Sequence, residues 1–125
     1  MQRRLSLLAA ATILLGASLP LHAVDAPVLR VVVVQTDSPD AYLKEIDRGR
    51  GILKRLGSAS TIRVWQARFA GDRAGALVVA VESPNLATFA KDEDRATSDP
   101  EYQAWMKDLQ KLRKVTSDSI YREMK

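Results

Sequence analysis

Two arginines, a tryptophan and a glutamine lie close together in one short segment, as Arg63, Trp65, Gln66 and Arg68. Side chains alternate between the two faces of a strand, so Arg63 and Trp65 share one face and the other two residues share the opposite face. If Arg63 and Trp65 point inward, they could hold a flat or anionic ligand by stacking and a charge-assisted hydrogen bond. The pattern favours another interpretation, an edge strand with exposed arginines whose Trp65 anchors the core. Neither face is uniformly apolar, so the four residues stand as candidate ligand-binding residues.

Few other side chains could support a metal site or a nucleophile. The chain has no cysteine, and its one histidine, His22, lies close to the N-terminus. Zinc, copper and non-haem iron sites generally use these side chains, and nucleophilic triads need a histidine. The acidic run in residues 91–95 (KDEDR) is flanked by basic residues, and we expect a solvated helix face rather than a calcium site. We therefore expect no metal and no cofactor.

The N-terminal residues have the layout of a secretory signal peptide. Arg3 and Arg4 precede an apolar stretch from Leu5 to Leu19, and Ala23 offers a small residue at the cleavage point. A membrane-spanning helix needs about 20 apolar residues, so an uncleaved anchor is the weaker interpretation. We expect residues 1–23 to be removed, leaving a periplasmic or secreted protein, residues 24–125, with no membrane attachment.

The remaining chain has the size and charge of one small globular domain. About 100 residues suit a single core, which packing must hold together because there are no disulfides to form. Basic and acidic residues are nearly balanced once the N-terminal arginines are removed. This balance argues against nucleic acid as a partner.

Hydrophobic patterning predicts four strands in a β-α-β-β-α-β order, with the second helix broken in two. The segments 28–35 and 76–82 are continuously apolar and rich in β-branched residues, which indicates buried strands. The segments 61–70 and 119–124 carry charges, which is typical of edge strands. The fold class is therefore α+β, with a ferredoxin-like antiparallel sheet, the apolar strands in its middle and the helices on one face.

Serine and proline mark the expected helix starts. The first helix should run from about Pro39 to Leu56, and later helices should be capped by Ser83 and by Ser98. Tyr102, Trp105 and Leu109 recur at helical spacing and should face the core. Gly49 and Gly51 interrupt the first helix, and we expect close packing against a neighbouring backbone there.

Several segments resemble the dimeric α+β barrel superfamily, which includes antibiotic-biosynthesis-type monooxygenases, stress-responsive barrel proteins and NIPSNAP-like proteins. The segments are "KRLGS" leading into "TIRVWQARFAG", then "GALVVAVESPNLATFA", "SDPEYQAWMKDL" and "SIYREM". The resemblance implies a dimeric α+β barrel over nearly all of residues 24–125, most similar to small NIPSNAP-like members. None of these segments is a catalytic motif, so no functional residue is transferred. Haem in this superfamily is commonly held by a histidine, which residues 24–125 lack.

The two apolar strands also predict a homodimer. They are apolar at every position from Val31 to Val34 and from Leu77 to Val81, so both faces of the sheet must be covered. The helices cover one face, and no further element of the chain can cover the other. A second copy would cover it by twofold symmetry.

Two functions fit these features. The leading hypothesis is a secreted or periplasmic dimeric protein that is non-catalytic or binds a small molecule. The alternative is a cofactor-free monooxygenase or isomerase that acts on an aromatic or quinone-like small molecule within the barrel. The sequence leaves open whether the protein is an enzyme.

Overall fold

The structure is a computed structural model that describes residues 26–69 and 71–125. The expected signal peptide, residues 1–23, lies outside the described residues. In chain order the elements are β1 (Val28–Gln35), α2 (Pro39–Arg55), β2 (Thr61–Gln66), the short 3-10 helix η1 (Gly71–Arg73), β3 (Leu77–Ser83), α3 (Leu86–Thr97), α4 (Pro100–Lys111) and β4 (Lys114–Arg122). None of the helices in these two ranges is long and apolar enough to cross a membrane.

The four strands form one antiparallel sheet in the order β2-β3-β1-β4. The two apolar strands, β1 and β3, therefore lie in the middle, and the two charged strands form the edges. This confirms the predicted α+β, ferredoxin-like arrangement. The edge strands differ from expectation in extent, because β2 already ends at Gln66 and β4 runs from Lys114 to Arg122.

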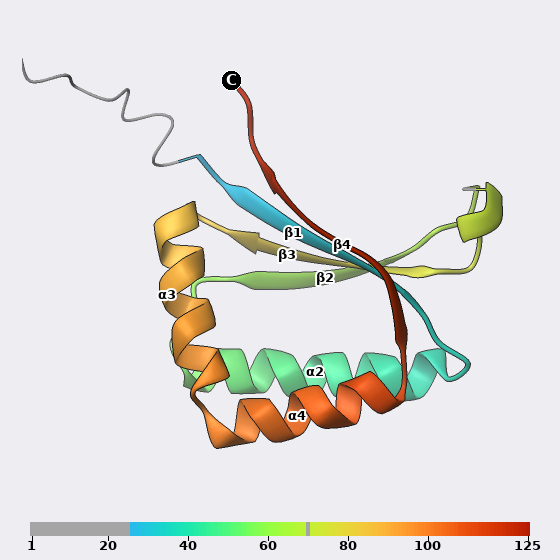
Figure 1. Ribbon diagram of the computed structural model, residues 1–125, viewed down its shortest axis with the longest axis horizontal. Helices are drawn as coiled ribbons and strands as arrows, with labels where there is room; N and C mark the ends of the chain where they lie inside the picture. The colour runs from blue at the N-terminus through green and yellow to red at the C-terminus, as the bar shows by residue number, and fades with distance from the viewer. Residues whose placement is uncertain (1–25, 70) are drawn as a thin grey trace, which may run out of the picture.

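All three helices lie on the same side of the sheet (Figure 1). Helices α2 and α4 run side by side beneath it, and α3 stands at one end. The core between the layers contains Val32 and Val79 from the central strands and Ile46, Trp105 and Leu109 from the helices. The predicted apolar stripe of α4 is thus confirmed as core.

The opposite face of the sheet is open in the single chain. Because Val32 and Val79 point toward the helices, their neighbours Val31 and Val78 point toward the open face. Trp65 pairs with Val78 across the strands and lies on the same face, where it is 59% exposed. The expectation that Trp65 anchors the core is therefore wrong for the single chain, because β2 turns its aliphatic residues, not Trp65, toward the helices.

Two of the predicted helix caps are wrong. Asn85 caps α3 by accepting a hydrogen bond from the Thr88 amide at 2.8 Å, and Asp99 caps α4 by accepting one from the Tyr102 amide at 3.0 Å. Ser83 instead remains in β3, 1% exposed, with its hydroxyl 2.6 Å from that of Ser60. Helix α2 starts at Pro39 as expected.

Only one of the two glycines of α2 is closely packed. A Cβ atom at Gly49 would lie 2.6 Å from Cε2 and 2.7 Å from Cη2 of Trp105. This confirms close packing there, although the neighbour is an indole ring rather than a backbone. At Gly51 no atom from outside the adjoining turns of the helix lies within 4 Å of the corresponding position, so the expectation is wrong for that residue.

Candidate functional site

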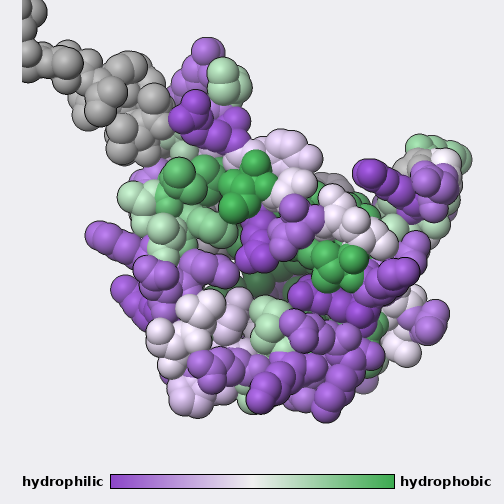
Figure 2. Space-filling model, in the orientation of Figure 1, coloured by the Kyte–Doolittle hydropathy of each residue, from purple (hydrophilic) through white to green (hydrophobic). Residues whose placement is uncertain are grey.

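A cavity of about 290 Å³ lies between the helix-facing side of the sheet and the three helices. Figure 2 shows a hollow on this side of the molecule, with hydrophobic residues at depth and hydrophilic residues around it. Ligand-binding pockets usually measure about 300–1,000 Å³, so this cavity is of a size for a small ligand. Its apolar lining residues are Val32, Ile46, Leu53, Ile62, Val79, Val81, Phe89, Ala96, Trp105, Met106, Leu109 and Val115.

Helix α4 supplies the aromatic wall of the cavity. Tyr102, Trp105 and Met106 all line it, because residues three and four apart share one face of a helix. The Trp105 indole Nε1 donates a hydrogen bond of 2.7 Å to the carbonyl of Glu45 on α2, which fixes the ring. The centroids of the Tyr102 and Trp105 rings lie 5.4 Å apart, and the two ring planes are inclined to each other by 59°. This tilted geometry is a favourable one for aromatic pairs, so the wall is both apolar and rigid.

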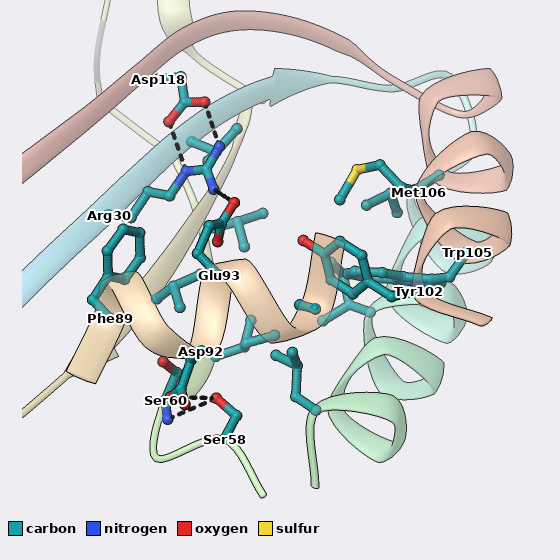
Figure 3. Close-up of a pocket in the computed structure, with 18 of the residues that line it drawn as sticks. Arg30, Ser58, Ser60, Phe89, Asp92, Glu93, Tyr102, Trp105, Met106 and Asp118 are labelled. Atoms are coloured by element: carbon teal, nitrogen blue, oxygen red, sulfur yellow. Dashed lines mark hydrogen bonds and ion pairs between the residues drawn. The ribbon is translucent and has the colours of Figure 1, made fainter. Parts of the chain in front are cut away.

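A charged cluster lies on the sheet side of the cavity. Arg30 donates from Nε and Nη2 to the two carboxylate oxygens of Asp118, at 3.0 and 2.8 Å. Its Nη1 reaches Glu93 of α3 at 3.5 Å (Figure 3). The hydrogen bond from Arg30 is the main cause that lowers the pKa of Asp118, and Asp118 in turn raises the pKa of Arg30. Such a two-point pair holds both side chains in fixed positions.

The hydroxyl of Tyr102 is the polar group best placed to contact a ligand. Figure 3 shows it directed into the cavity toward Glu93. Burial raises the pKa of Tyr102, and the negative charge of Glu93 raises it further. The phenol therefore stays protonated at neutral pH and can donate a hydrogen bond.

A second polar group lies midway along α3. Asp92 accepts hydrogen bonds from the Ser58 hydroxyl and from the Ala59 amide, both at 3.0 Å. The expectation of a solvated face over residues 91–95 is thus wrong for Asp92 and Glu93, which line the cavity. Within the described residues, no three His, Cys, Asp or Glu side chains are placed to hold one metal ion.

The four residues singled out in the sequence do not lie at this cavity. Arg63 and Trp65 point onto the open face of the sheet, since the alternating residues Ile62 and Val64 pack against the core on the helix side. Gln66 is the last residue of β2, and Arg68 follows in the exposed loop. The structure therefore brings none of the four to the cavity, and their role in ligand binding stays a prediction.

The residues that do form the polar part of the cavity were missed in the sequence. Arg30, Glu93 and Asp118 come from three elements that are far apart along the chain. One signal was available, because Arg30 is a single charge inside an otherwise apolar central strand. A buried charge needs a partner, so its position indicated that a carboxylate lies beside it.

Comparisons with known proteins identify the fold. No protein-family model matches the sequence, and no curated protein does. A NIPSNAP family protein of unknown function from Agrobacterium tumefaciens is 17% identical, with 79% of this chain and 89% of that chain covered and a TM-score of 0.62. An uncharacterised NIPSNAP domain protein from Burkholderia xenovorans is 16% identical, with 79% and 92% covered and a TM-score of 0.59.

A third similar structure is SnoaB from Streptomyces nogalater, described as a cofactor-independent oxygenase. It is 11% identical, with 80% of this chain and 95% of that chain covered and a TM-score of 0.62. At such identities the likeness extends to the fold alone. The chain therefore has the α+β fold of the NIPSNAP and SnoaB structures, as its resemblance to them in sequence led us to expect.

Proposed function

We propose that the protein binds a flat, largely apolar small molecule in the cavity between its sheet and its helices. The observation that supports this is the cavity itself, about 290 Å³ in size, with an apolar lining and a few polar side chains directed into it. Protein interiors are normally close-packed, so a hollow of this size beside a rigid aromatic wall is typical of a binding site.

The polar groups indicate how such a ligand is oriented. The Tyr102 hydroxyl offers a hydrogen bond to a ligand oxygen, while the ring of Trp105 supplies an apolar contact. Arg30 is already engaged by Asp118 and Glu93, so it contributes a fixed polar wall rather than a free charge. A flat ring system with one polar edge fits these groups.

Calorimetric titration with the neutral probe 2-naphthamide tests this proposal. Met106 lines the cavity and is only partly buried, so Met106→Trp should fill it and abolish binding. The control Met106→Leu conserves the volume of the side chain and should bind as the wild type does. Equal binding by both variants would mean that the probe occupies another site, and absence of binding by the wild type would refute the proposal.

A second candidate function is cofactor-free oxygenation or isomerisation of an aromatic or quinone-like compound. Glu93 and the protonated Tyr102 face each other in the cavity, which is the arrangement of a general base and a hydrogen-bond donor. Glu93 would remove a proton from the substrate, and Tyr102 would stabilise the oxyanion that develops. Oxygen uptake with a hydroxylated anthrone that is lost in Glu93→Gln would support this function. If the wild type takes up no oxygen, this second function is contradicted and small-molecule binding remains the proposed function.

We also propose that the protein is a homodimer joined through the open face of the sheet. Val31, Val33 and Val78 lie in the centre of this face, with Trp65 exposed at its edge. Large aromatic side chains beside an apolar patch are typical of interface anchors. Light scattering after gel filtration should give twice the mass of one chain, and the mass of a single chain at micromolar concentration would contradict the proposal.

Secretion is part of the same proposal and rests on the sequence of the N-terminus. Arg3, Arg4 and the apolar stretch after them have the order of a signal peptide, with cleavage after Ala23. Mass spectrometry of the protein recovered from a bacterial periplasm should give a chain that begins at Val24. An intact N-terminus in the cytoplasmic fraction would contradict secretion.

A further inference from the structure

Arg113 is the second arginine of the cavity, and it lies apart from the Arg30 cluster. It follows Leu112 at the end of α4 and precedes β4. Its Nη1 donates to the Tyr42 hydroxyl at 3.1 Å, and its Nη2 lies 3.7 Å from the sulfur of Met106. Both partners are neutral, and a thioether is a weak acceptor.

Arg113 forms no ion pair within the described part of the chain. Every ion pair there involves another basic residue, so no carboxylate oxygen lies within 4.0 Å of the Arg113 guanidinium. Its Nε is also the one buried side-chain polar atom of residues 26–69 and 71–125 that lacks a hydrogen-bond partner. Arg113 itself is partly buried. A guanidinium carries a positive charge, and such a charge without an ion-pair partner can accept an anionic one. Arg30, by comparison, is paired with two carboxylates.

Two of the three acidic residues that line the cavity lie toward its other end. Asp92 and Glu93 come from α3, which stands at one end of the sheet, whereas Arg113 comes from the opposite end, where α4 meets β4 (Figure 1). Asp118 is occupied by Arg30. The positive charge of Arg113 nevertheless reaches the cavity, since it contributes, after Arg30, to lowering the pKa of Asp118. An anionic group would thus be attracted toward Arg113 and repelled from α3.

We propose that the ligand carries an anionic oxygen group, such as a carboxylate or a phenolate, and that Arg113 is the residue that selects for it. This inference rests on the proposed binding function and adds the chemical class of the ligand. The apolar ring system lies against Trp105 and the central strands, and its charged end lies at the junction of α4 and β4. Arg113 is then a specificity-determining residue held in place by Tyr42.

Two isosteric probes separate this inference from the binding function itself. The carboxylate 2-naphthoate and the amide 2-naphthamide have the same ring system and nearly the same shape. We expect the wild type to bind naphthoate about tenfold more tightly, because a hydrogen bond to a charged group is stronger than one between neutral groups. Arg113→Gln should lose this preference and keep its affinity for naphthamide. The control Arg73→Gln makes the same change in charge in η1, outside the cavity, and should behave as the wild type does.

The outcomes distinguish the two claims. Binding of naphthamide with no preference for naphthoate, or a preference that survives in Arg113→Gln, would overturn the anion inference and leave the binding function intact. Failure of both probes would overturn both. If Arg113→Gln does not fold, the nuclear magnetic resonance signal of the Arg113 Nε–H in the wild type tests the anion inference instead. It should shift with naphthoate more than with naphthamide, and equal shifts would overturn the inference.

Discussion

Replacing Gly49 by alanine should destabilise the protein, although alanine is the better helix former. A Cβ at this position would lie 2.6 and 2.7 Å from two atoms of the Trp105 ring and closer still to a third, Cζ2. Trp105 is 4% exposed, and its indole N–H is bonded to the Glu45 carbonyl, so the ring cannot move away freely. Overpacking costs about 1–3 kcal/mol, and a strained indole hydrogen bond adds about 1 kcal/mol. The gain in helix propensity is about 1 kcal/mol, so the net loss should be about 1–3 kcal/mol.

Gly51→Ala is the matched control in the same helix. Nothing lies within 4 Å of its added Cβ, so the propensity gain should appear alone, as a stabilisation of up to about 1 kcal/mol. Urea unfolding followed by circular dichroism, at one fixed protein concentration, measures both variants. If the two free energies of unfolding agree within about 0.5 kcal/mol, the packing of Gly49 against Trp105 is not as described.

Three further predictions concern the sheet and the charged cluster. Val79 is 5% exposed in the core, so Val79→Lys should prevent folding, whereas Val78→Lys on the open face should give a folded monomer by light scattering. Trp65→Ala should weaken the dimer, which light scattering would show as a lower mass on dilution. The free energy of unfolding of the single chain, measured in urea, should stay within about 1 kcal/mol of the wild-type value. The pKa of Asp118 is lowered in the folded state, so the pair with Arg30 stabilises the fold at neutral pH, and this contribution is lost as the pH falls below 3.8. Asp118→Asn should therefore be less stable than the wild type at pH 7, and urea midpoints should show the difference shrinking in acid.

The architecture was predictable because its strongest signals are local. The continuous apolar runs of β1 and β3 required burial on both sides, which placed these strands in the middle of the sheet. The helical spacing of Tyr102, Trp105 and Leu109 likewise identified the buried face of α4. The helix starts were less certain, because Ser98 and Asp99 are both good caps. Tertiary contacts decided between them, since Asp99 also pairs with Arg55 at 2.7 Å.

The site was not predictable in the same way, because its residues meet only in the folded chain. Arg30, Glu93 and Asp118 lie on β1, α3 and β4, and they meet only because β4 pairs with β1 and α3 packs beside the sheet. The orientation of Trp65 was not predictable either. Its strand carries apolar and polar residues on both faces, so alternation alone could not say that Trp65 faces away from the helices.

The two tryptophans of the chain offer the most direct test of the cavity as the binding site. Trp105 lines the cavity, whereas Trp65 lies on the open face of the sheet, and the protein has no other tryptophan. A ¹H–¹⁵N spectrum of the ¹⁵N-labelled protein therefore contains one indole signal for each site, which Trp65→Phe assigns. On titration with 2-naphthamide, binding in the cavity should shift the Trp105 indole signal and leave that of Trp65 in place. A shift confined to Trp65, or no shift of either signal, would contradict the proposed binding site.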